Sequence, residues 1–187
     1  MSTHHEILKE ISKVIPKYIK KIEVNFDIIT LTLKKPEDLT TLLLFFKNYS
    51  NTQFKTLIDI TAVDYIGDAQ RFEIIYILLS VSFNKRIILK ILSNEKTPIP
   101  SATTIFSNAN WLEREVWDMF GIFFFNHSDL RRLLTDYGFE GHPLKKDFPL
   151  SGYTEVRYDE TKKQVISEPI EVTQEFRQFD CSSPWEK

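Results

Sequence analysis

The stretch from Trp111 to Asp159 restricts the folds open to this chain more than any other, because charged residues of both signs alternate in it with large aromatic residues. From Asn126 to Tyr153 neither a helical nor a strand period holds. So long an irregular run in a compact domain is either disordered or functional, and its aromatic residues argue against disorder. Charge interleaved with aromatic side chains is typical of a surface that another protein covers, where aromatic and Arg anchors carry most of the binding energy.

The residues before this stretch show regular periods, which predict an α+β fold with a mixed, mainly antiparallel sheet and flanking helices. Apolar residues at helical spacing predict a helix over residues 5–21, broken at Pro16, and a second over residues 36–49 that buries Leu39, Leu42, Leu43 and Phe46. Alternating apolar residues predict strand structure in residues 21–33, with a tight turn or bulge at residues 27–28, and an antiparallel meander at residues 54–64, 71–83 and 86–92.

A third helix is expected to end at Phe120. Asn110 with Glu113 three residues later is close to a capping box, and Gly121 suits the left-handed position that closes a helix. The inner side of this helix should carry Leu112, Val116, Met119 and Phe120. The other side should carry Glu113, Arg114, Trp117 and Asp118, with Arg114 and Asp118 forming an ion pair one turn apart. We expect residues 97–101 to break the sheet before this helix, and residues 122–125 to add a fourth core strand after it.

The C-terminal part should form a hairpin and then an arm. Residues 155–158 and 164–167 predict the hairpin. Residues 169–187 show no core-forming period, although they contain Phe176, Phe179 and Trp185. We therefore expect a core domain at residues 1–125, an irregular docking segment with a terminal hairpin at 126–168, and an extended arm at 169–187 that becomes ordered on a partner.

Composition excludes several classes of function. A net charge of −2 argues against nucleic acid as a partner. The single cysteine, Cys181, cannot supply the four thiolates of an iron–sulfur cluster, and it cannot form an internal disulfide, which indicates a reducing compartment. No apolar run reaches the ~20 residues that a membrane span needs. The glycines form no cluster of the kind that binds dinucleotides.

Some side chains could take part in chemistry, and each has a structural alternative. A zinc site would need His127, His142 and Cys181 together with an acid, but their spacing matches no standard zinc motif. Both histidines could carry protons near neutral pH, although we favour a role in stabilising turns or an interface. Asp59 and Asp64 lie five positions apart in a predicted strand and therefore on opposite faces, which argues against a catalytic pair.

Two pairs of cations follow the third helix. Arg131–Arg132 and Lys145–Lys146 could together grip an anion. The alternative, which we favour, is that they pair with nearby acids or with acids on a partner protein. The nearby acids are Asp129, Asp136 and Asp147.

The stretch also contains a long ordered set of motifs. It reads Glu113-Arg114-Glu115-x-x-Asp118-Met119-Phe120 and, after six residues, His127-x-x-x-Arg131-x-Leu133-Leu134. It continues with Thr135-Asp136-Tyr137-Gly138-Phe139-Glu140-Gly141-His142-Pro143-Leu144, with Asp147-Phe148-Pro149-Leu150-Ser151-Gly152-Tyr153 and with Glu155-Val156-Arg157-Tyr158-Asp159. These motifs resemble the family of the hydrophilic 30 kDa subunit of respiratory NADH:ubiquinone oxidoreductase (complex I). One departure is Asn126-His127-Ser128-Asp129, where the family usually has proline in place of the serine.

The resemblance implies a noncatalytic core subunit in the peripheral arm of a proton-translocating NADH dehydrogenase, which supports electron transfer from NADH to ubiquinone by docking the quinone-module subunits. It implies that this chain binds no cofactor, and that NADH, FMN, iron–sulfur clusters and ubiquinone belong to partner subunits. The expected partners are chiefly the 49 kDa-type quinone-module subunit and neighbouring iron–sulfur subunits. The expected location is the matrix side of the mitochondrial inner membrane or, alternatively, the cytoplasmic face of a bacterial plasma membrane, with no transmembrane segment in this chain.

By the same resemblance, the subunit interface comprises Glu113, Arg114, Glu115, Trp117, Asp118, His127, Asp129, Arg131, Arg132, Asp136, Tyr137, His142, Lys145, Lys146, Tyr153, Arg157, Phe176, Phe179 and Trp185. Two alternatives stay open. One is the equivalent subunit of a related membrane-bound hydrogenase or ferredoxin-linked complex. The other is an autonomous enzyme that uses the Asp, His and Arg residues of positions 126–147.

Overall fold

The computed structural model describes residues 13–177 except Asp27, together with Phe179, Cys181, Ser183 and Trp185. The chain divides into two compact units, Met1–Phe148 and Pro149–Lys187. Residues 126–148, which the sequence assigned to a docking segment separate from the core, therefore belong to the first unit.

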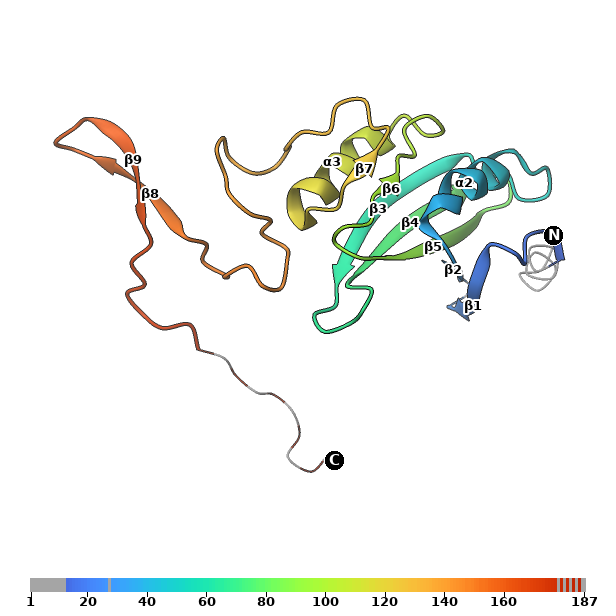
Figure 1. Ribbon diagram of the computed structural model, residues 1–187, viewed down its shortest axis with the longest axis horizontal. Coiled ribbons are helices and arrows are strands. Elements are labelled where there is room, and N and C mark those ends of the chain that lie inside the picture. The colour runs from blue at the N-terminus through green and yellow to red at the C-terminus, as the bar shows by residue number, and fades with distance from the viewer. Residues whose placement is uncertain are drawn as a thin grey trace. The chain divides into compact units, whose positions relative to one another are not determined.

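The first unit is built on a five-stranded sheet with the order β1-β2-β5-β4-β3 (Figure 1). Every neighbouring pair is antiparallel except β2 and β5, which run parallel. The strands are β1 (Ile19–Asn25), β2 (Ile28–Leu33), β3 (Thr56–Asp64), β4 (Phe72–Ser80) and β5 (Lys85–Ser93). The predicted mixed, mainly antiparallel sheet and its meander of three strands are thus confirmed.

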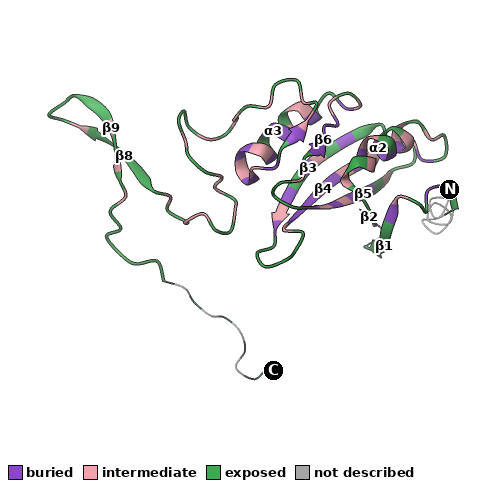
Figure 2. Cartoon of the chain, viewed as in Figure 1, coloured by how far each residue is buried: buried purple, intermediate pink, exposed green. Residues whose placement is uncertain are grey.

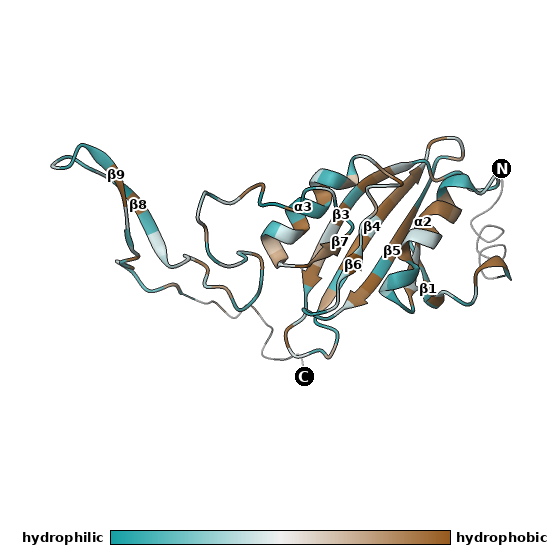
Figure 3. Cartoon of the chain, turned by 45° about the horizontal axis from the view of Figure 1, so that its top comes forward, coloured by the Kyte–Doolittle hydropathy of each residue, from teal (hydrophilic) through white to brown (hydrophobic). Residues whose placement is uncertain are grey.

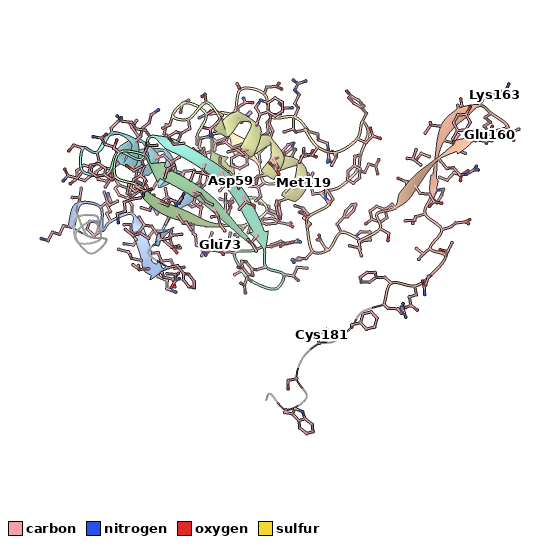
Figure 4. All side chains as sticks on the ribbon, turned by 180° about the vertical axis from the view of Figure 1, so that it is seen from behind. Asp59, Glu73, Met119, Glu160, Lys163 and Cys181 are labelled. Atoms are coloured by element: carbon pink, nitrogen blue, oxygen red, sulfur yellow. The ribbon has the colours of Figure 1, made fainter. Side chains whose placement is uncertain are left out.

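Alternation along the strands separates the two faces of the sheet. In β4 the residues at even positions are buried, and those at odd positions, apart from Glu73, are only partly buried (Figure 2). Hydrophobic residues run along the central strands (Figure 3), and the alternating burial shows which of them face the core. Asp59 and Glu73 lie on the face away from the helices (Figure 4), whereas Asp64 is buried on the other face. The prediction that Asp59 and Asp64 point to opposite faces is therefore confirmed.

Helix α2 (Leu39–Asn48) follows a 3-10 turn, η1 (Pro36–Asp38), which places proline where a helix begins and where its missing N–H costs nothing. The helix buries the four predicted residues, and each of them is at most 1 % exposed. Removing such side chains from water is worth roughly 1.5–3 kcal/mol each. Packing, rather than helix propensity, therefore holds α2 against the sheet.

The predicted helix over residues 5–21 is wrong at its C-terminal end. Residues 13 and 14 are helical, Pro16 lies in a turn, and β1 begins at Ile19. A proline cannot donate the backbone hydrogen bond that a helix interior needs, so it favours the turn. Residues 5–12 lie outside the described part of the chain. The turn predicted at residues 27–28 begins earlier, because Phe26 takes the left-handed conformation at φ 50° and Ile28 already belongs to β2, which pairs with β1 as a hairpin.

The predicted fourth core strand at residues 122–125 is also wrong. Only β7 (Phe124–Phe125) is a strand, and it pairs in parallel with β6 (Ile99–Pro100) in a separate two-stranded sheet. The backbone of Ile99 donates to Phe123 at 2.9 Å, and that of Ser101 donates to Phe125 at 3.0 Å. Pro100 between them has no N–H, which suits a two-residue pairing and not a longer ladder.

The second unit contains the predicted hairpin, formed by β8 (Thr154–Asp159) and β9 (Gln164–Pro169). Glu160 and Lys163 lie at its tip (Figure 4), and Lys163 takes the left-handed conformation at φ 51°. The backbone of Ile170 donates to Tyr153 and extends the pairing by one bond. After Ile170, the described residues form no helix or strand.

Candidate docking surface on helix α3 and the loop that follows

Helix α3 (Ala109–Phe120) begins two residues earlier than the predicted capping box requires, and that prediction is wrong. The cap residue is Asn108, whose side chain donates to the backbone oxygen of Leu57 at 2.7 Å instead of capping the helix. Glu113 is fully buried, and its carboxylate accepts hydrogen bonds from Ser101 Oγ and from the backbone N–H of Ala102, both at 2.6 Å. Glu113 therefore joins α3 to the segment that follows β6.

The environment of Glu113 changes its acidity. Burial raises the pKa of Glu113 to about 7, and the hydrogen bonds from Ser101 and Ala102 oppose that rise only in part. His127 lies 3.9 Å away. The backbone N–H of Asp129 donates to His127 Nδ1, so Nε2 carries the ring proton and donates to the oxygen of Asn110 at 3.1 Å. Both nitrogens of this ring are used inside the fold, which supports a role in stabilising the turn.

Asp118 organises the loop after α3. Its fully buried carboxylate accepts the backbone N–H groups of Leu133, Leu134 and Thr135 at 2.7–3.0 Å, and the Thr135 hydroxyl at 2.7 Å. Arg132 Nη1 pairs with it at 3.0 Å. Burial alone would raise the pKa of Asp118, but the hydrogen bonds from the loop outweigh burial and hold the pKa well below its ordinary value. A carboxylate on the helix thus fixes three consecutive loop residues.

Arg114 does not pair with Asp118 as predicted. It is 7 % exposed and donates through Nε and Nη2 to the backbone oxygens of Arg131 and Arg132, at 3.2 and 3.3 Å. Its guanidinium lies 5.5 Å from the centre of the Trp111 ring. The expectation that Glu113, Arg114 and Asp118 form an outward charged side of α3 is therefore wrong, because all three hold other segments of the chain.

A second group of charges fastens the end of the loop to the sheet. Arg71 forms two hydrogen bonds with the buried carboxylate of Asp64, at 2.6 and 2.7 Å, and the backbone N–H of Lys146 donates to the same carboxylate at 2.8 Å. The Arg71 hydrogen bonds are the main cause that lowers the pKa of Asp64. The sequence analysis missed Arg71. A usable signal was that Asp64 takes an inward-facing position of β3, where an acid needs a partner.

The two lysines predicted to act as a pair have different roles, because the backbone N–H of Lys146 binds Asp64 while the side chain of Lys145 pairs with another acid. Lys145 pairs with Glu95 at 3.1 Å, and Arg71 pairs with Asp147 at 3.1 Å. Among the acids expected to neutralise the cations after α3, Asp129 pairs with Arg131 at 2.9 Å. Pairing with acids is thus confirmed for Arg131, Arg132 and Lys145, but two of the three partners differ from those predicted, since Arg132 pairs with Asp118 and Lys145 with Glu95.

His142 covers the end of α3. Its Nδ1 lies 2.9 Å from the backbone oxygen of Asp118, and its ring lies 5.5 Å from that of Trp117. Gly121 ends the helix in the left-handed conformation at φ 75°, as predicted, and a Cβ there would lie 2.7 Å from the His142 ring. The backbone of Leu144 donates to Met119 at 3.0 Å. The loop thus folds back onto the helix end because no side chain at position 121 prevents it.

The predicted interface residues differ widely in exposure. Those buried are Glu113, Arg114 and Asp118. Those partly buried are Trp117, His127, Arg132, His142 and Lys145. Those exposed are Glu115, Asp129, Arg131, Asp136, Tyr137, Lys146, Tyr153, Arg157, Phe176, Phe179 and Trp185. Exposed aromatic side chains of the first unit include Trp111 and Tyr137, which line a cavity of about 590 Å³ beside α3.

Two further properties bear on what this surface does. In the described part of the chain, no three side chains among His, Cys, Asp and Glu are grouped so that they could hold a metal ion. Within the same residues, no helix has both the length and the apolar character needed to cross a membrane.

Comparison with known proteins identifies clear relatives. The sequence model of the family described as "Respiratory-chain NADH dehydrogenase, 30 Kd subunit" matches residues 32–154. The chain is 53 % identical to NADH-ubiquinone oxidoreductase subunit 9 of Reclinomonas americana over 98 % of this chain and 91 % of that protein. It is 56 % identical to NADH dehydrogenase [ubiquinone] iron-sulfur protein 3 of Beta trigyna over 91 % of this chain and 88 % of that protein.

A solved structure shares the fold. It belongs to the membrane-bound sulfane sulfur reductase, an archaeal respiratory membrane complex, and superposes with a TM-score of 0.68. The match covers 80 % of this chain and 87 % of the other, at 23 % sequence identity. At that level of identity the likeness concerns the fold alone.

Proposed function

The chain belongs to the family of the 30 kDa subunit of respiratory-chain NADH dehydrogenase, and from that premise we propose that it is a noncatalytic docking subunit of complex I. It supports electron transfer from NADH to ubiquinone by holding the quinone-module subunits in place. In this role the NADH, FMN, iron–sulfur clusters and ubiquinone are bound by partner subunits.

The main support for this proposal is that the charged signature residues of α3 form their hydrogen bonds inside the fold. Glu113, Arg114 and Asp118 are the residues of the signature best suited by burial to chemistry, yet their hydrogen bonds go to the backbone and side chains of neighbouring segments. They give the irregular loop one defined shape. A rigid irregular surface rich in aromatic and Arg side chains is what a protein partner can recognise.

The cysteine content supports the same proposal. A relative carries "iron-sulfur protein" in its name, but this chain has one cysteine, Cys181, and a cluster normally needs four thiolates. Cys181 is exposed and free. The chain's contribution to a cluster-containing enzyme is therefore contact with the subunits that hold the clusters.

The proposed location and partners follow from the same role. The chain acts peripherally at the matrix side of the mitochondrial inner membrane, with the 49 kDa-type subunit and the adjacent iron–sulfur subunits as neighbours. Relatives at 53–56 % identity are named for the NADH–ubiquinone enzyme, which favours this assignment over a hydrogenase or ferredoxin-linked complex. Proton translocation belongs to the whole assembly in this scheme.

An autonomous enzyme that uses residues 126–147 has less support. The base that it would need, His127, uses both ring nitrogens inside the fold, with Asn110 and Asp129. A general base must instead have a hydrogen-bonding position free for its substrate.

The purified full-length chain tests the noncatalytic role. We expect no visible absorbance from flavin or clusters, no stoichiometric iron, and no oxidation of NADH with ubiquinone analogues or ferricyanide as acceptor. The control is a membrane preparation of the intact enzyme assayed in parallel. Stoichiometric flavin or iron in the isolated chain, or turnover that follows it through purification, would contradict the proposal.

A further inference from the structure

A cavity of about 590 Å³ lies in the first unit between the N-terminal half of α3 and the loop at residues 131–138. Its lining includes Trp111, Arg114, Arg131, Arg132, Asp136 and Tyr137. The loop wall cannot collapse into this space, because Asp118 fixes the backbone of residues 133–135 from behind. The cavity is therefore a preformed feature, which lowers the entropic cost of filling it.

The charge of this cavity is positive, although the chain as a whole carries −2. Three arginines line it against one acid, Asp136. Arg132 is balanced by the buried Asp118, which leaves Arg114 and Arg131. Arg131 shares its charge with Asp129, but both side chains of that pair are more than half exposed, and such surface pairs are weak and easily exchanged.

Arg114 is the more informative of these two cations. It is 93 % buried, and it uses Nε and Nη2 for backbone oxygens, so Nη1 has no hydrogen-bond acceptor among the described residues. Nη1 is not among the buried side-chain atoms that lack a hydrogen-bond partner in the described residues, so it is open to the solvent of the cavity and can donate to an acceptor that enters there. A carboxylate is the protein group that matches a guanidinium best.

The rim of the cavity is aromatic. Trp111 is 63 % exposed and Tyr137 is fully exposed, and both are unusual positions for large rings in a surface that stays in water. Trp, Tyr and Arg together are the residues most enriched among those that dominate binding energy at protein interfaces. The rim therefore suits an apolar or aromatic residue next to the acid that enters the cavity.

We propose that this cavity is the docking pocket for an acidic side chain, Asp or Glu, on a partner subunit of the respiratory complex, with an apolar neighbour of that acid packed between Trp111 and Tyr137. The proposal rests on the proposed docking function and names the chemistry of one contact. The incoming carboxylate accepts from Arg114 Nη1 and Arg131, and Arg131 exchanges Asp129 for it.

Charge reversal in the assembled complex tests the pocket. Arg131→Glu should lower incorporation of the full chain into the membrane complex roughly tenfold, as read by native electrophoresis and immunoblotting. The matched control is Lys20→Glu, an equal charge change at an exposed position of β1, at the edge of the sheet away from β3, and it should incorporate like the wild type. Equal incorporation of the two variants would overturn the proposal.

A photo-crosslinker identifies the occupant. p-Benzoylphenylalanine in place of Tyr137, irradiated in the assembled complex, should crosslink to a partner peptide that contains Asp or Glu beside an apolar residue. Changing that acid to Lys should then restore incorporation of Arg131→Glu. A crosslink to this chain's own arm, to lipid or to a peptide without acids would overturn the pocket while leaving the docking function intact. A wild-type chain that fails to enter the complex would instead contradict the docking function itself.

Discussion

Replacing Glu113 with Gln should change how the stability of this protein depends on pH. The folded-state pKa of Glu113 is raised from 4.5 to about 7, chiefly by burial. Between these two values the folded protein binds a proton that the unfolded chain releases. The stability that protonated Glu113 contributes is therefore complete below pH 4.5 and is lost as the pH rises through about 7.

The size of this effect follows from the same two values. A pKa of about 7 in place of 4.5 corresponds to roughly 3 kcal/mol, lost from the free energy of unfolding between pH 4.5 and 8. Gln imitates the protonated acid, because its oxygen accepts from the Ala102 N–H and its amide donates to Ser101 Oγ. Glu113→Gln should therefore match the wild type near pH 5 and exceed it by up to about 3 kcal/mol at pH 8.

Urea denaturation at pH 5, 6, 7 and 8, followed by tryptophan fluorescence, measures the difference. Asp64 and Asp118 have lowered pKa values, so their contributions change only at more acidic pH and are common to both proteins. The matched control is Glu115→Gln on an exposed position of the same helix, which should show no pH-dependent difference from the wild type. A Glu113→Gln advantage that is constant with pH, or that is largest at pH 5, would refute the argument.

Three further changes test other parts of the fold. Asp118→Asn should lower the free energy of unfolding by about 2–4 kcal/mol, because it weakens the hydrogen bonds to Leu133, Leu134 and Thr135. It should also speed hydrogen exchange in residues 131–138. The control, Asp129→Asn at an exposed position, should lower the free energy of unfolding by less than ~0.5 kcal/mol. Gly121→Ala should lower the melting temperature more than Gly138→Ala, since both glycines have φ near 70° but only the Cβ at 121 meets His142; equal losses would contradict this. Truncation after Ile170 should change the free energy of unfolding by less than ~0.5 kcal/mol. It should nevertheless reduce incorporation into the complex, because the exposed side chains of Phe176, Phe179 and Trp185 are lost as anchors. A truncated chain that assembles normally would argue against the arm's role.

The parts of the fold that the sequence predicted are those where a local period determines the outcome. The alternation in β3, β4 and β5 and the helical stripe of α2 recur every two or every 3.6 residues, so each strand or helix could be recognised without knowing its neighbours. Gly121 was predictable for a similar reason, since a helix end needs a left-handed residue.

The roles of the charged residues on α3 could not be predicted in this way. Arg114 and Asp118 lie one turn apart, and the helical rule pairs them. Their actual partners lie 14–18 positions further along the chain, in a loop without a period. The contact of Asp64 with Lys146 spans 82 positions. Long-range contacts of this kind depend on the tertiary fold, and no local sequence pattern predicts them.

The proposed interface was predicted from resemblance, and the structure changes its content. Glu113, Arg114 and Asp118 shape the surface from inside, while Arg131, Asp136 and Tyr137 present it to solvent. A signature of charged residues in sequence therefore mixes two functions, internal bracing and external contact, and only burial separates them.

Immunocapture of the native chain from membranes solubilised in mild detergent tests the docking function most directly. The account predicts that the chain is recovered in stoichiometric amounts within a large complex that oxidises NADH with a ubiquinone analogue. Recovery of the chain without NADH:ubiquinone activity, or of a fully active complex that lacks the chain, would contradict it.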